Sequence, residues 1–253
     1  MKYMIMDVEK TTYEYYSHWT GVEMSPEKQG TVFNYNPERD IVPRGYAQSS
    51  DVYVFCKDNF TVVSYGNRAK EKIEKTKGGI EKSNGVDVLR TLLEKTFLAK
   101  AGKNIKYIYR NRLESPLPAV ILNAGHCELF LDFFRKNNPN DRDYSWVREY
   151  FLELASKNYC HGIILDNKLV SATDAPDMPY MQELVQEIGI NTLKEYCGKG
   201  YARAACISLI NELLPRNICP LWSTGENNIA SDRLAKSIGF EKLADVLTIN
   251  IPE

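Results

Sequence analysis

Residues 197–202 read Cys-Gly-Lys-Gly-Tyr-Ala, and this stretch decides the fold of the C-terminal half. It follows an apolar segment at 185–193 that predicts a strand, and it leads into a segment at 201–214 with apolar residues at helical spacing. Glycines let a backbone turn tightly, and a helix N-terminus adds unpaired N–H donors and partial positive charge. The turn is therefore suited to bind a pyrophosphate through Cys197, Gly198, Lys199, Gly200, Tyr201 and Ala202.

A Gly-x-Gly turn before a helix is weak by itself, because many such turns only connect two elements. The chain lacks the Gly-rich run ending in Gly-Lys-Ser/Thr of P-loop proteins and the third glycine of dinucleotide-binding turns. The turn therefore indicates either a diphosphate ligand of another class or a plain connection. Cys197 is either a reactive thiol or a small residue that fills the turn.

The composition excludes several classes of protein. The 253 residues are 43% apolar and 26% charged, with a net charge of −1, so nothing favours nucleic acid or anionic membrane as a partner. The six cysteines form no C-x-x-C pair, which argues against a metal site. The start is not typical of a signal peptide, and no apolar run approaches the length of a membrane helix. We expect a cytoplasmic protein.

Two α/β regions are predicted, 1–117 and 118–253, with a proline-containing connector at 112–118. The first 50 residues are tyrosine-rich and lack a clear period. Beyond them, the pattern predicts a hairpin at 51–57 and 60–66, helices at 67–77 and 86–97 and a strand at 105–110. Gly78 and Gly79 are expected to end the first helix, and Gly102 to close the second. The role of 1–117 is unassigned; it packs on the C-terminal half or caps its substrate side.

The C-terminal region alternates strands and helices, which indicates a mixed central sheet flanked by helices, in the α/β (α+β) class. Asp166 and Asn167 suit a tight hairpin turn. The predicted strands are 119–122, 161–165, 168–172, 185–193, 218–222, 240–243 and 246–251, and the predicted helices are 128–136, 144–157, 201–214 and 229–237.

This region resembles the GNAT (GCN5-related) N-acetyltransferase superfamily, in particular bacterial members with an extra N-terminal region. The superfamily carries an Arg/Gln-x-x-Gly-x-Gly/Ala loop after its fourth strand. Residues 197–202 match it at Gly200 and Ala202 and depart from it at Cys197. A second signature is matched in the same order by Asn228, Ser231, Leu234, Gly239 and Phe240.

The resemblance implies that acetyl-CoA binds where the fourth and fifth strands splay apart. Its pantetheine chain would pair with backbone groups of Asn191, Thr192 and Leu193, and an N–H near Leu193 would stabilise the oxyanion of the intermediate. The pyrophosphate would lie on residues 197–202, with Asn228 and Ser231 also at the cofactor.

The implied reaction is transfer of an acetyl group from acetyl-CoA to an amine by direct attack. Glu187 is the candidate base, with Asn191 holding a water relay; Glu187 is alternatively a structural residue. Many members of the superfamily have a tyrosine as general acid where this chain has Ala235, so a non-catalytic acyl-CoA-binding regulator is the alternative function.

The acceptor would be a small-molecule or peptide amine, and the chain would act alone or as a homodimer. Asp174 and Asp177, in the segment before residue 180, either face the substrate or are ordinary loop acids.

Overall fold

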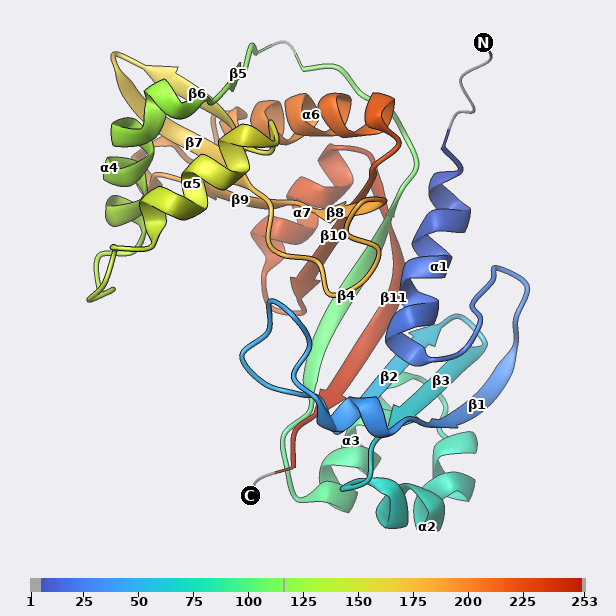
Figure 1. Cartoon of the computed structure of the whole chain (residues 1–253). Helices are drawn as coiled ribbons and strands as arrows, with labels where there is room; N and C mark the ends of the chain where they lie inside the picture. The colour runs from blue at the N-terminus through green and yellow to red at the C-terminus, as the bar shows by residue number, and fades with distance from the viewer. Residues whose placement is uncertain (1–5, 116, 252–253) are drawn as a thin grey trace.

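The computed structural model describes residues 6–115 and 117–251 (Figure 1). Seven strands form one sheet in the order β1-β3-β2-β11-β4-β10-β8. Both halves of the chain contribute to it, because β4 from the N-terminal region lies antiparallel between β10 and β11. Its strands are β1 (Gly30–Tyr35), β2 (Val52–Lys57), β3 (Phe60–Tyr65), β4 (Gly102–Tyr109), β8 (Val185–Glu187), β10 (Cys219–Gly225) and β11 (Phe240–Ile249).

A second sheet has four strands in the order β5-β6-β7-β9. These are β5 (Val120–Ile121), β6 (His161–Leu165), β7 (Lys168–Asp174) and β9 (Gly189–Thr192). The predicted hairpin of β6 and β7 is confirmed. Asp166 and Asn167 both adopt positive φ, 47° and 56°, as a tight two-residue turn requires.

Helices cover the faces of both sheets (Figure 1). α4 and α5 pack together beside the four-stranded sheet, and α6 contacts its strands β6, β7 and β9. α7 lies against β10 and β11. The helices are α1 (Val8–Thr20), α2 (Lys70–Glu81), α3 (Val86–Phe97), α4 (Cys127–Asn137), α5 (Val147–Ser156), α6 (Tyr201–Leu213) and α7 (Ile229–Ser237), with 3-10 turns η1 (Pro37–Asp40), η2 (Ala124–His126), η3 (Lys194–Tyr196) and η4 (Leu214–Arg216).

Helix α1 falls in the part of the sequence that shows no clear period. Asp7 caps it, accepting a hydrogen bond from the backbone N–H of Lys10 at 3.0 Å. Its buried face is aromatic and includes Tyr13, Tyr16 and Trp19, which pack onto the seven-stranded sheet. Tyrosine is only weakly apolar, so the helical spacing of buried residues is hard to see in the sequence, although the aromatic face of α1 is fully buried.

Four sequence predictions are wrong in their boundaries. The strand expected at 185–193 is two strands, β8 and β9, in different sheets. α2 continues through Gly78 and Gly79 because the hydrogen bonds of the helix outweigh the free-energy cost of placing glycine in it. Gly102 begins β4 and does not close α3, which ends at Phe97 and is followed by Leu98 in a left-handed conformation. The two closing strands are one long strand, β11, with an irregularity between Lys242 and Ala244.

The mixed α/β class with a central sheet flanked by helices is confirmed. The strand pairing crosses the boundary expected between residues 117 and 118, so the two predicted regions share one sheet. Among the residues that the structure describes, no helix is long and apolar enough to cross a membrane.

Candidate active site

The chain passes from the seven-stranded sheet to the four-stranded sheet at Ile188. Before it, β8 runs parallel to β10, and the Ile188 N–H donates to the Leu221 carbonyl at 3.1 Å. After it, β9 pairs with β7 on the other side. The chain therefore leaves one sheet and joins the other within a few residues, which separates β9 from β10.

A cleft of about 710 Å³ lies at this separation. Its lining includes most of the residues predicted from the two signatures, from the turn before α6 and from the start of α7. These are Glu187, Asn191, Thr192, Cys197, Gly198, Gly200, Tyr201, Ala202, Asn228 and Ser231. Leu193 and Lys199 do not line it; Leu193 is buried, and the Lys199 ammonium lies 5.0 Å from the centre of the Tyr196 ring.

The predicted role of the Leu193 N–H needs correction. It donates to the Val170 carbonyl at 2.9 Å, so β7 already occupies it. Backbone groups in an antiparallel pair alternate in direction, and Thr192 pairs with Ser171 in the register. Asn191, like Leu193, therefore turns its N–H and carbonyl groups toward β7, contrary to its predicted role, whereas Ile190 and Thr192 turn theirs away from β7, toward the cleft.

The glycine-rich turn presents the N-terminus of α6 to the cleft. Gly198 and Gly200 have φ of 75° and 82°, a left-handed conformation that favours glycine. Gly200 is the N-cap of α6, and no side chain caps the helix there. The first-turn N–H groups of Tyr201, Ala202 and Arg203 are thus available as donors to an anion.

Two arginines extend the positive character of the cleft beyond the predicted residues. Arg203 and Arg233 both line it. Arg203 is anchored by a 3.2 Å hydrogen bond from its Nε to the Ser237 carbonyl, and Arg233 is exposed. Arginines one turn into a helix are common in proteins of any function, so the sequence alone carried no signal for either.

Asn228 and Ser231 have clear structural roles at the cleft. The Asn228 Oδ1 accepts from the Ser231 N–H at 3.1 Å and so caps α7. The Ser231 Oγ accepts from the Trp222 Nε1 at 3.1 Å. Ala235, one turn further, is completely buried, and the much larger side chain of a tyrosine would clash there.

Glu187 ends β8 at the inner edge of the cleft and is half-buried. Its Oε1 accepts a hydrogen bond from the Ser223 Oγ on β10. Lys106 is paired with Ser223 in the sheet. Burial lowers the pKa of Lys106, and the negative charge of Glu187 opposes that shift.

Asp174 is a largely buried carboxylate that the sequence did not distinguish from a loop acid. It ends β7 opposite Gly189, and a Cβ at Gly189 would lie 1.6 Å from the Asp174 Oδ1, so the carboxylate rests directly over the glycine backbone. Burial, and next the charge of Glu187, raise the pKa of Asp174 to about 6. A glycine two residues after a strand glutamate is the only signal that could have indicated this contact.

A second cleft, of about 550 Å³, adjoins Asp174 on the side of α5. Aromatic side chains of Phe134, Trp146 and Tyr150 form part of its wall. Both clefts include Pro176 in their lining, so they meet near the ends of β7 and β8. Within 6–115 and 117–251, no group of three or more His, Cys, Asp or Glu side chains could hold a metal ion.

Comparison with known proteins relates the C-terminal half of the chain to one family. A family model described as GNAT acetyltransferase matches residues 161–245. A GNAT acetyltransferase from Colwellia psychrerythraea has the same fold, with a TM-score of 0.50 and 18% identity over 62% of this chain and 60% of its own. Residues 161–245 thus match the GNAT acetyltransferase family, and the chain has the fold of a GNAT acetyltransferase.

Further GNAT structures are more distant. A GNAT-family protein from Novosphingobium aromaticivorans is 19% identical over 59% of this chain and 64% of its own, with a TM-score of 0.45. The yncA protein of Salmonella typhimurium, solved with its cofactor acetyl-CoA, is 14% identical over 55% of this chain and 96% of its own, with a TM-score of 0.42. Among curated proteins, none matches the sequence significantly.

The chain spans 60% and 64% of the length of the Colwellia and Novosphingobium proteins. The family match runs from the start of β6 into β11 and includes both GNAT signatures, Glu187 and the cleft. Strands β1 to β5 lie outside the match, although β4 lies inside the shared sheet, between β11 and β10.

Proposed function

We propose that this protein is an N-acetyltransferase that transfers the acetyl group of acetyl-CoA to an amine. The observation that carries the proposal is the cleft at the separation of β9 from β10, with the N-terminus of α6 at one end and Glu187 at the other. An anion-binding end and a carboxylate end are what a reaction between a CoA thioester and an amine requires.

Acetyl-CoA would lie along β9. The N–H groups at the start of α6 would hold its pyrophosphate, and Arg203 and Arg233 would add positive charge beside its phosphates. The backbone groups of Ile190 and Thr192 that face away from β7 would pair with the pantetheine chain as a neighbouring strand does, in place of the weak 3.9 Å contact from the Cys197 thiol to the Thr192 carbonyl.

Catalysis would proceed by direct attack of the amine on the thioester carbonyl. A new C–N bond forms, the carbonyl oxygen becomes an oxyanion, and collapse of the intermediate breaks the C–S bond. The N–H of Ile190, nearest to Glu187 among the cleft-facing groups of β9, would stabilise the oxyanion. Glu187 would accept the proton of the amine, and the CoA thiolate would take a proton from solvent.

Asn191 and Asp174 would complete the proton path. Asn191 is exposed and pairs with Ala172 of β7. Asp174 lies two residues after Ala172 on the same strand, so the Asn191 and Asp174 side chains lie on the same face of the sheet. A carboxyl group with a pKa of about 6 is suited to exchange protons at neutral pH.

Replacement of Glu187 tests the proposal. Glu187→Gln keeps a side chain that can hydrogen-bond with Ser223 but removes the base, so kcat/KM should fall by about 10²–10⁴-fold. Acetyl-CoA affinity, measured by calorimetry, should stay unchanged. Turnover is read by free-thiol release with a panel of primary amines.

Glu81→Gln, at an exposed position at the end of α2, is the matched control and should leave turnover intact. If the unaltered protein binds acetyl-CoA but acetylates no amine, that result supports the alternative function of a non-catalytic acyl-CoA-binding regulator. Equal turnover of Glu187→Gln and the unaltered protein would contradict the role of Glu187 as base.

A further inference from the structure

Arg39 is an arginine that is buried without a charged partner. It lies in η1, and only 3% of it is exposed. Its Nε is buried and has no hydrogen-bond partner, and its guanidinium makes no ion pair or hydrogen bond with any residue that the structure describes. A buried charge without a partner destabilises the fold, so it needs an explanation beyond stability.

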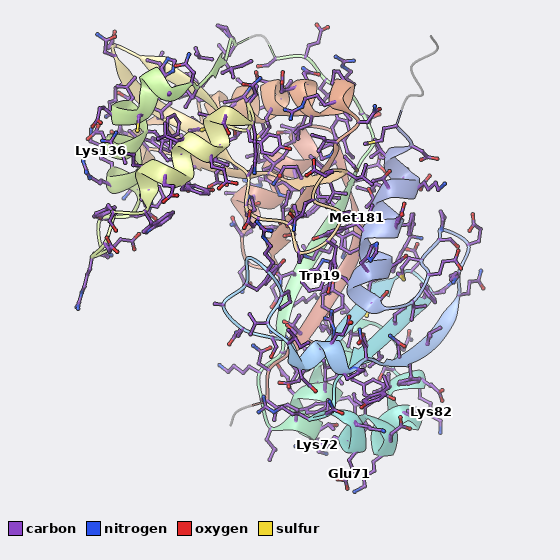
Figure 2. All side chains as sticks on the ribbon, viewed as in Figure 1. Trp19, Glu71, Lys72, Lys82, Lys136 and Met181 are labelled. Carbon is purple, nitrogen blue, oxygen red and sulfur yellow. The ribbon has the colours of Figure 1, made fainter. Side chains whose placement is uncertain are left out.

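Two aromatic rings form the surroundings of Arg39. Its Cζ lies 5.4 Å from the centre of the Trp19 ring and 5.3 Å from that of Tyr53. The two rings stack on each other, 5.2 Å apart and 12° from parallel. Figure 2 shows Trp19 beside the long strands of the sheet, near the C-terminal end of α1.

These cation–π contacts orient the guanidinium but leave its N–H groups unused. The hydroxyl oxygen of Tyr53 is also buried and has no partner within the described ranges. Arg39 and Tyr53 therefore bring two unused hydrogen-bond donors together. A planar guanidinium beside a hydroxyl matches the oxygen atoms of a carboxylate or a phosphate.

Tyr53 connects this pair of donors to the active site. Burial raises the pKa of Tyr53; the positive charge of Arg39 lowers it, and the negative charge of Glu187 raises it. The phenol thus lies within electrostatic reach of both groups. The geometry agrees, because Tyr53 belongs to the same hydrophobic cluster as Met178, whose Sδ accepts a hydrogen bond from the Glu187 N–H at 3.3 Å.

The rim of the cluster is accessible. Tyr46, 44% exposed, meets the edge of Trp19 at 5.3 Å, and the half-buried Tyr180 meets Trp19 at 5.5 Å. Tyr46 belongs to a segment joining η1 to β2, which is tied down by an ion pair of 3.1 Å between Arg44 and Asp177, both more than half exposed. Breaking one surface ion pair costs little, so Tyr46 can move aside to admit a ligand.

We propose that Arg39, with Trp19 and Tyr53, recognises an anionic group of the acceptor, so that the substrate is an amine that also carries a carboxylate or a phosphate. This inference rests on the proposed acetyltransferase function. The N-terminal region would then supply the specificity of the enzyme: the amino group faces Glu187, and the anionic group lies on Arg39.

The test compares three series of amines: neutral alkylamines, amino acids of increasing chain length and amino-alkyl phosphates. With the unaltered protein, kcat/KM should be at least tenfold higher for an anionic series than for the neutral series. Preference between the second and third series distinguishes carboxylate from phosphate. Arg39→Met should remove the preference by raising KM for the anionic amines while leaving the neutral amines and acetyl-CoA affinity unaffected.

Stability provides a second readout. Because the Arg39 guanidinium has no ion pair or hydrogen bond among the described residues, Arg39→Met should raise Tm or leave it unchanged, whereas a purely structural arginine would lower Tm on replacement. Arg142→Met, at an exposed position in the loop before α5, is the matched control. Two results would overturn the inference and leave the acetyltransferase proposal standing. One is an equal loss of kcat/KM with neutral and anionic amines in Arg39→Met, and the other is a lowered Tm with no change in the preference for anionic amines.

Failure of the function itself gives a different result. If no amine in any series is acetylated, calorimetry with the same anionic amines in the presence of CoA decides the inference. Binding that disappears in Arg39→Met supports the anion site, and absence of binding overturns it.

Discussion

At the scale of single residues, Asp174 and Glu187 show how the fold assigns different properties to two carboxylates. Glu187 is held by the hydroxyl of Ser223, whereas no hydrogen bond to the Asp174 carboxylate is present among the described residues. Burial favours the neutral form of Asp174, which gives it a pKa of about 6. The folded protein therefore binds a proton at Asp174 more tightly than the unfolded chain does.

A pH dependence of stability follows from Asp174. Its contribution to the free energy of unfolding is greatest below the unfolded pKa, near 3.8, and is lost as pH rises through about 6. Asp174→Asn should remove this loss, so the variant should become more stable than the unaltered protein above pH 6, by at most about 3 kcal/mol. Urea unfolding between pH 4 and pH 8 measures the difference, and parallel curves for the two proteins would contradict the assignment.

At the scale of elements, the turn before α6 depends on backbone conformation more than on side chains. Gly200→Ala places a Cβ at φ 82°, which costs about 1 kcal/mol even though the nearest side-chain atom, of Leu117, lies 3.6 Å away. Relief of this strain would rotate the N–H groups of the turn, so acetyl-CoA affinity should fall about tenfold in calorimetry.

Gly78→Ala is the control for this prediction. Gly78 lies within α2, and nothing lies within 4 Å of a Cβ built there. The substitution should stabilise the protein by about 0.5–1 kcal/mol because alanine favours helix. Unchanged acetyl-CoA affinity in Gly200→Ala would show that the turn does not hold the cofactor.

At the scale of the whole molecule, β4 binds the two halves of the chain together. It pairs with β10 on one side and β11 on the other, and its Tyr107 and Ile108 are buried in two different hydrophobic clusters. A fragment of residues 118–253 would leave β11 without a partner strand and β10 paired only with β8. It should show no cooperative thermal transition by circular dichroism, and co-expression with residues 1–117 should restore both the transition and acetyl-CoA binding. A fragment that unfolds cooperatively by itself would contradict this view.

The sequence by itself determined the local features of this protein. The hairpin at Asp166 and Asn167, the glycine turn before α6 and the Asn228 cap of α7 depend on backbone preferences within a few residues, which composition and spacing express directly. The two signatures therefore located the cleft and Glu187. Both also lie within residues 161–245, the stretch that matches the GNAT acetyltransferase family.

Only the tertiary structure decided what depends on partners distant in the sequence. The Leu193 N–H donates to the Val170 carbonyl and so is not available in the cleft. The cleft itself forms because the chain changes its partner strand at Ile188. Insertion of β4 joined the two regions, and the packing of α1 left Arg39 buried among aromatic rings. Strand pairing and burial are set by contacts between segments that lie from about twenty to more than a hundred residues apart, so no local pattern contains them.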